Sequence, residues 1–223
     1  MWHDLKVWQE VRDWYWKKKV HRTLNALKKN DFDAMYFPTR TEVVAKVLQL
    51  IPPNALVGVG GSVTIREIGL VDSLEQRGNT IISHWEAQKK RQKPEEVMKA
   101  RKLLASADIF LTSTNAITEE GHLVNIDHAG QRVAAMIFGP QKVIIIAGVN
   151  KIVRSVVHAM DRIRDVAAPM NAKRLNLQVP CAETGSCSDC VSTNRICNVT
   201  TIIERRPVHT DSTIILLGET VGF

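Results

Sequence analysis

Short apolar runs alternate with amphipathic segments along most of the chain, and this alternation predicts an open α/β fold. Strand-like runs, which end at glycine, proline or polar residues, cover residues 33–37, 55–59, 79–83, 108–111 and 143–149. Segments with helical spacing follow most of them, at residues 40–50, from 63, from 94, at 132–138 and at 152–168. Strands that alternate with helices form a mostly parallel sheet with helices on both faces.

The rest of the pattern adds smaller elements to that sheet. Apolar pairs at 116–117 and 123–124 predict a hairpin, and residues 84–93 are polar and basic, which predicts an exposed loop. After Pro169 we expect extended chain, and residues 200–203 and 212–217 predict a final pair of edge strands. The helix at 152–168 is expected to bury the stripe Val153, Val156, Val157, Met160, Ile163 and Val166.

The N-terminal region, residues 1–30, predicts a tryptophan-rich helix that precedes a single α/β domain, residues 31–223. Four of the five tryptophans lie in it: Trp2, Trp8, Trp14 and Trp16. They either pack the helix onto the domain or form a docking surface, because tryptophan is enriched at interfaces. The two roles are compatible in a homo-oligomer, and we expect the protein to form one.

Three of the predicted strands end in glycine, hydroxyl or amide residues, where open α/β sheets bind ligands. The run Gly58–Ser62 joins a strand to a helix, so its backbone N–H groups can receive an anion, although Ser62 is also a plain N-cap. Lys151 ends the third run and is the best candidate for holding a carboxylate or phosphate. The candidate ligand-binding residues are Gly60, Gly61, Ser62, Thr64, Thr112, Ser113, Thr114, Asn115, Asn150 and Lys151.

Asp127 stands beside His128, which suggests a catalytic triad with Ser113 as nucleophile. A triad is a spatial arrangement that adjacency in sequence does not establish. The interpretation of these residues as turn and N-cap positions is therefore favoured.

Composition and charge limit the function. The 223 residues are 44% hydrophobic and 24% charged, which is ordinary for one globular domain. No apolar run is long enough for a membrane span, and the N-terminus lacks a secretory pattern, so we expect a cytoplasmic protein. The net charge of +7 comes from dispersed basic residues. This dispersal favours an anionic small molecule or an acidic partner over nucleic acid.

All four cysteines lie in one segment, residues 180–198, with the spacing C-x5-C-x2-C-x6-C. Four thiolates at this spacing are typical of a [4Fe–4S] cluster, and structural zinc is the alternative. Disulfides are disfavoured because a cytoplasmic chain keeps its thiols reduced. The predicted metal ligands are Cys181, Cys187, Cys190 and Cys197.

Several stretches together resemble the LUD-domain family, which is named for lactate utilisation, over roughly residues 20 to 220. They are Gly60–Thr64, Gly121–Asp127, Arg132–Ala135, Phe138–Pro140, Gly148–Val153, Thr184–Cys190 and Arg195–Asn198. The resemblance implies a fold similar to the group of ribose-phosphate isomerase, glucosamine-phosphate deaminase and CoA-transferase. It also implies an anion site at Gly58–Ser62 and, for forms with the cysteine motif, an iron–sulfur cluster on the four cysteines. Some members work beside iron–sulfur and flavin subunits that oxidise lactate to pyruvate.

Three functions follow as hypotheses. The first is an iron–sulfur protein with an electron-transfer or accessory role in the oxidation of lactate or a related organic acid, working with redox partner proteins. The second is an enzyme that acts on a phosphorylated or CoA-linked small molecule at the three strand ends. The third is a zinc-stapled interaction protein that uses its tryptophan-rich N-terminus.

Overall fold

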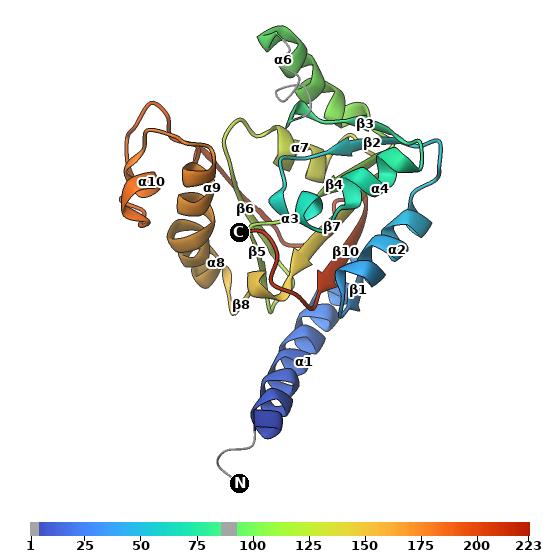
Figure 1. Ribbon diagram of the computed structural model, residues 1–223, viewed down its shortest axis with the longest axis vertical. Helices are drawn as coiled ribbons and strands as arrows, with labels where there is room; N and C mark the ends of the chain where they lie inside the picture. Colours follow the sequence, from blue (N-terminus) through green and yellow to red (C-terminus); the bar gives the residue numbers. More distant parts are fainter. Residues whose placement is uncertain (1–4, 86–92) are drawn as a thin grey trace.

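The computed structural model describes residues 5–85 and 93–223, and its centre is a six-stranded sheet (Figure 1). The strand order is β1-β10-β7-β4-β2-β3, and every neighbouring pair is parallel. The predicted open α/β sheet is therefore confirmed. The strands are β1 (Asp33–Phe37), β2 (Leu56–Val59), β3 (Thr80–Ile82), β4 (Ile109–Thr112), β7 (Lys142–Gly148) and β10 (Asp211–Leu217).

Both faces of this sheet are buried, as the continuous apolar strands require. In β7, Ile144 and Ile146 pack on one face, while Val143 and Ile145 pack on the other. The first face is covered by α2 (Arg40–Leu50), α3 (Val63–Glu67) and α4 (Leu70–Gln76). The second is covered by the end of α1 (Leu5–Lys29), by α7 (Gln131–Ile137), by η1 (Leu104–Ser106) after α6 (Pro94–Leu103), and by a second sheet.

The second sheet has the order β8-β5-β6-β9 and contains the predicted hairpin. Strand β6 pairs antiparallel with both β5 and β9. Ala159 and Ile163 pack against its outer side, next to Ala116 and Val124. Its strands are β5 (Ala116–Thr118), β6 (Leu123–Asp127), β8 (Ile152–Val153) and β9 (Val199–Ile203).

The two final strands form as predicted, but their pairing with each other is wrong. Strand β9 is an edge strand of the second sheet, and β10 lies inside the main sheet, between the edge strand β1 and β7. The physical reason is visible in β10 itself, because all residues from Ser212 to Leu217 are buried. A run without an exposed side needs neighbours on both edges and on both faces.

The predicted helix at 152–168 also differs from the structure. Residues 152–153 form β8, and the helical region consists of α8 (Val156–Arg162), the π-helical turn η3 (Ile163–Ala167) and α9 (Ala168–Arg174). Pro169 does not end it, because it occupies the first turn of α9, where a missing N–H is tolerated. Two residues of the predicted buried stripe are exposed: Val157 in α8 is 68% exposed, and Val166 in the π turn is 38% exposed. Helix α10 (Pro180–Thr184) follows after a short connection.

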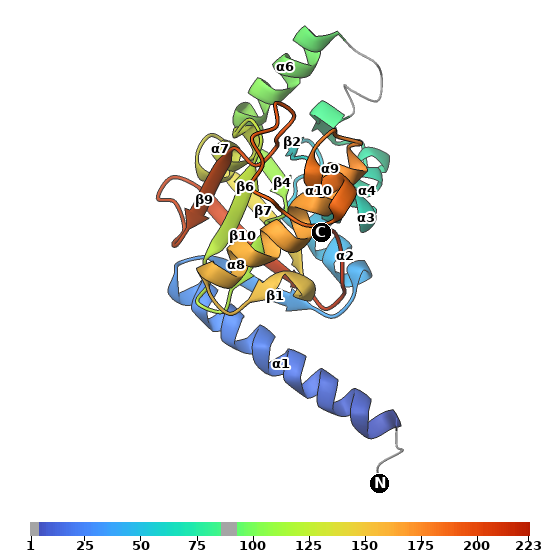
Figure 2. The ribbon, with the colours of Figure 1, turned by 90° about the vertical axis from the view of Figure 1, so that its left-hand side faces the viewer.

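Helix α1 is as long as predicted but is buried only near its C-terminal end. Val20 and Leu27 pack into the core, whereas Trp8, Trp14 and Trp16 are exposed. Figures 1 and 2 show the N-terminal half of the helix projecting from the body. Trp2 lies outside the described residues, and a docking role for the other three tryptophans in a homo-oligomer stays a prediction.

The stretch predicted as an exposed loop at 84–93 is only partly described. His84 and Trp85 form a helical turn, and His84 is buried rather than exposed. Residues 86–92, with most of the basic cluster, lie outside the described residues. In the parts of the chain that are described, no helix has both the length and the apolar content that a membrane crossing requires.

Candidate functional site

The three polar strand ends meet at one cavity of about 310 Å³. This follows from the sheet order, because β2, β4 and β7 are neighbours and all three are parallel. Their carboxyl ends therefore lie side by side, at the edge where α/β sheets bind ligands. The predicted residues that line the cavity are Gly61, Ser62, Thr64, Ser113, Thr114, Asn115 and Lys151.

The other three predicted ligand residues lie behind this lining. A Cβ on Gly60 would stand 3.0 Å from Thr112 Oγ1, so the glycine lets β2 and β4 approach each other. Asn150 turns away from the cavity and uses its side-chain carbonyl to accept a hydrogen bond from the Val221 N–H group at 3.3 Å. A direct ligand role for these three residues stays a prediction that the geometry does not favour.

Lys151 joins two of the loops at the cavity floor. Its Nζ donates hydrogen bonds to Thr64 Oγ1 at 2.9 Å and to Ser113 Oγ at 3.1 Å. The side chain is only 3% exposed. The pKa of Lys151 is lowered to about 7, mainly by burial and also by the nearby charges of Arg162 and Arg132, while Glu67 partly opposes the shift.

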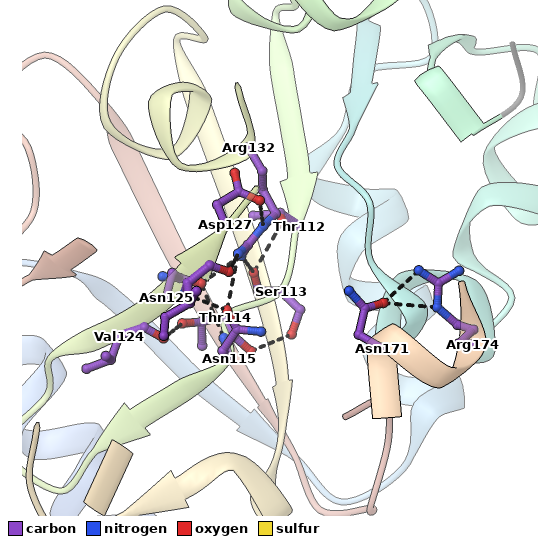
Figure 3. Close-up of polar contacts among 11 residues, drawn as sticks. Thr112, Ser113, Thr114, Asn115, Val124, Asn125, Asp127, Arg132, Asn171 and Arg174 are labelled. Carbon is purple, nitrogen blue, oxygen red and sulfur yellow. Dashed lines mark hydrogen bonds and ion pairs between the residues drawn. The ribbon is translucent and has the colours of Figure 1, made fainter. Parts of the chain in front are cut away.

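Arg132 is a residue that sequence reasoning missed, and it organises one wall of the cavity (Figure 3). Its Nη1 donates to Asn125 Oδ1 at 2.7 Å and to the Ser113 carbonyl at 3.2 Å. Its Nη2 donates to Asn115 Oδ1 at 3.2 Å and to the Ile126 carbonyl at 3.1 Å. These bonds fix the β4 end to β6. Burial lowers the pKa of Arg132, and the carboxylate of Asp127 opposes that shift.

The proposed triad is not assembled. The Asp127 carboxylate lies 3.7 Å from Arg132 Nε, as the ion pair in Figure 3 shows, and Ser113 Oγ is hydrogen-bonded to Lys151. The alternative interpretation as turn and N-cap residues holds only for the turn at His128, because Asp127 is the last residue of β6 and pairs with Val199. The N-cap of α7 is Gly130.

The opposite wall comes from residues that gave little indication in the sequence. The Trp85 ring receives two guanidinium groups, with Arg66 at 4.5 Å and Arg174 at 4.6 Å from its centroid. His84 lies beside Trp85 and lines the cavity. Burial lowers the pKa of His84 to about 4, and the charges of Arg101 and Arg66 add to the effect. Figure 3 shows Arg174 bound to Asn171 on α9, apart from the Arg132 network.

The cavity wall is basic and polar. Its described charged side chains are Arg101, Arg132, Lys151 and Arg174 against the single carboxylate of Asp127. Buried polar atoms without a hydrogen-bond partner among the described residues also face it, and such atoms mark a wall suited to a polar ligand. They are His84 Nδ1, Arg101 Nε, Asp127 Oδ2 and Gln131 Oε1.

The cysteine segment forms a loop that Arg195 holds together. Arg195 donates to the carbonyl oxygens of Cys190 at 2.6 Å and Cys197 at 3.0 Å, and it pairs with Asp189 at 2.9 Å. Burial raises the pKa of Cys197, and the other three thiols raise it as well. The four thiols therefore lie close enough to interact electrostatically. All four cysteines are free and half-buried.

The donor set of this segment fits the metal group that the family resemblance implies. Four thiols gathered on one loop are the soft ligands that iron–sulfur clusters and zinc require. In the ranges 5–85 and 93–223, no three Cys, His, Asp or Glu side chains already stand at the spacing of a metal site. The loop thus brings the four thiols near one another but not to the spacing of a metal site, and their role as metal ligands stays a prediction.

The cysteine segment also reaches the cavity. Ile196 and Cys197 line it, beside Leu177 and Arg174 from the α9 side. A small apolar core packs the segment against the body. It contains Ala172 of α9, Ala182 of α10 and Val179, the N-cap of α10. A metal group on the four cysteines would therefore lie next to the basic cavity.

Comparisons with known proteins agree with this architecture. The model of the LUD domain family matches residues 20–217, a range that includes all four cysteines and every cavity-lining residue except Phe223. A crystal structure of a DUF162 family protein from Deinococcus radiodurans is similar, with a TM-score of 0.53 and 12% sequence identity. The alignment covers 91% of this chain and 97% of that one, and at this identity it shows the fold alone. Among curated proteins, none matches the chain.

Proposed function

The chain belongs to the LUD domain family, and from this premise we propose that it is an iron–sulfur protein of lactate or related organic-acid oxidation. Its role is electron transfer or an accessory one, in company with redox partner proteins. The observation that carries the proposal is the position of Cys197, which lines the same cavity as Lys151 and Ser113. A redox group and an anion site that share a wall serve the oxidation of an organic acid.

The chain's own residues divide the work between two places. Cys181, Cys187, Cys190 and Cys197 would hold the cluster, which supplies one-electron chemistry when it is bound. Four protein ligands satisfy such a cluster, so the organic acid binds to the protein and not to iron. Arg101 lines the cavity, and its guanidinium charge attracts a carboxylate.

The size of the cavity favours a small acid over a CoA-linked substrate. A volume of about 310 Å³ lies at the lower end of small-molecule pockets. A carboxylate of a few carbon atoms fits this volume, whereas a nucleotide-bearing thioester requires an extended groove. The enzyme hypothesis for a CoA-linked molecule is accordingly the weaker of the two.

The proposal is tested by the iron and acid-labile sulfide content of anaerobically purified protein, together with its visible spectrum. We expect about four irons and four sulfides per chain. Cys187→Ser and Cys190→Ser should lose most of both, because each removes one thiolate of the central pair. Ser186→Ala, which changes a hydroxyl of the same loop, is the matched control and should keep its metal.

The other outcomes separate the alternatives. Stoichiometric zinc without sulfide would make the segment a structural staple and favour an interaction protein. A chain that binds neither iron nor zinc, or a Cys187→Ser variant with full iron, would show that the four-cysteine site is wrong.

A further inference from the structure

Lys151 is a buried amine whose surroundings suit a nucleophile better than a fixed cation. Its Nζ bonds to two hydroxyl oxygens, Thr64 Oγ1 and Ser113 Oγ, and no described carboxylate forms an ion pair with it. The hydroxyl of Ser113 donates to the Thr114 carbonyl at 3.3 Å, so its oxygen is free to accept from the lysine. A neutral amine has two N–H donors, and both find an acceptor here. These two bonds leave its lone pair unused, and Lys151 lines the cavity.

Of the charged groups on three elements around the amine, those on two favour this neutral form. Arg132 of α7 and Arg162 of α8 both lower the pKa of Lys151, and Glu67 of α3 is the opposing carboxylate. Burial is the largest cause, and the resulting pKa is about 7. The uncharged fraction of Lys151 at neutral pH is therefore much larger than that of a surface lysine, which is almost fully protonated. Desolvated lysines beside other cations are the ones that form Schiff bases with carbonyl compounds.

We propose that Lys151 Nζ forms an imine with the carbonyl carbon of a 2-oxo acid bound in the cavity. The inference rests on the proposed function for the acid class of the ligand, since a 2-oxo acid is the oxidised partner of a 2-hydroxy acid. The Nζ lone pair forms the C–N bond, the carbonyl C–O bond breaks, and the oxygen leaves as water with the two protons of the amine. No oxidant or reductant takes part.

The neighbouring hydroxyls have a defined part in this step. Ser113 Oγ and Thr64 Oγ1 contact Nζ directly and are the nearest groups that can pass a proton to the departing oxygen. The basic wall, with Arg101 and Arg174, attracts the carboxylate of the same ligand. Carbonyl and carboxylate together define the substrate class.

The test is reductive trapping of the purified full chain with pyruvate and cyanoborohydride at pH 7, followed by digestion and mass spectrometry. We expect one carboxyethyl group on Lys151, at least tenfold above the level on Lys142, a partly exposed lysine that pairs with Asp211. Trapping at Lys151 should rise with pH through about 7 and then level off. Ser113→Ala should slow it by at least about tenfold, as the loss of a proton-transfer group does.

The controls separate this inference from the proposed function. Lys142→Arg should leave the labelling at Lys151 unchanged, Lys151→Arg should abolish it, and acetone, which lacks the carboxylate, should label at least tenfold less. Cys187→Ser should still be labelled, so the result does not depend on the metal. Equal labelling of Lys151 and Lys142 in the unmodified chain, or acetone labelling equal to that of pyruvate, would overturn the inference even if the iron content is as proposed.

Discussion

The basic cavity and the cysteine segment share a wall but are built in opposite ways. The cavity is formed by strand ends, and its central groups are buried and tied into the sheet, as Arg132 and Lys151 show. The cysteine segment contains the short helix α10 and otherwise turns, and its thiols are half-buried. The Arg195 side chain donates hydrogen bonds to the backbone carbonyl oxygens of Cys190 and Cys197.

This difference shows what fixes the positions of the side chains in each site. The sheet sets the cavity geometry before any ligand binds, which is the preorganisation that recognition of a small molecule needs. The cysteine loop gathers its donors but leaves their final positions to the metal, because metal binding and local folding are coupled in such sites. Substitutions in the two regions should therefore have different consequences.

The largest decrease in the free energy of unfolding is expected for Arg132→Met, a substitution in the cavity wall. Removing this guanidinium leaves the buried carboxylate of Asp127 and several carbonyl oxygens without a donor, at a cost of about 3–5 kcal/mol in the free energy of unfolding. Urea denaturation measures it. Arg205→Met, which removes an exposed ion pair with Asp31, is the control and should cost less than about 1 kcal/mol. Equal losses in the two variants would contradict the central role of Arg132.

A smaller effect is expected from pH, through His84. Its folded pKa of about 4 lies below the unfolded value of 6.5, so the unfolded chain binds more protons between these two values. The free energy of unfolding should then fall as the pH is lowered from 6.5 to 4, by up to about 3 kcal/mol from this residue. The difference between the unmodified chain and His84→Gln isolates its contribution. Parallel pH profiles of the two proteins would exclude it.

The smallest change in global stability is expected on the cysteine side, with Arg195→Met. The side chain is partly exposed, so the free energy of unfolding should change by less than about 1 kcal/mol. The loop should nevertheless open, and limited proteolysis within residues 186–197 should become several times faster. Arg164→Met, an exposed change on the π-helical turn, is the control. A proteolysis rate that Arg195→Met leaves unchanged would show that this arginine does not order the loop.

Sequence patterns predicted the parts of the fold that depend on local order. The strand predicted at 143–149, which is β7 (Lys142–Gly148), and the helix predicted at 40–50, which is α2, are examples, because the hydrophobic period is local. The meeting of the three strand ends followed only from the strand order, which is a tertiary property. For β10, the apolar run was visible, but its place between β1 and β7 was not.

The candidate site shows the same limit. Ser62, Ser113 and Lys151 follow strands, so the rule for parallel sheets located them. Arg132 lies within an apolar helical stripe, where an arginine gives no sign of its partners on other strands. His84 and Trp85 stand at the start of a polar stretch, and their burial depends on Arg66 and Arg174 from distant helices. No period in the sequence encodes such contacts.

The position of β10 has a consequence for the order in which the chain acquires its structure during synthesis. In the main sheet, strand β1 pairs only with β10, with Asp33 opposite Thr213. Residues 33–37 therefore cannot pair until residues 211–217 have been synthesised. Until β10 emerges, the nascent chain carries β1 unpaired and one edge of β7 open, a state exposed to aggregation. Non-local pairing of this kind also slows folding. The main sheet therefore closes only once residues 211–217 have left the ribosome.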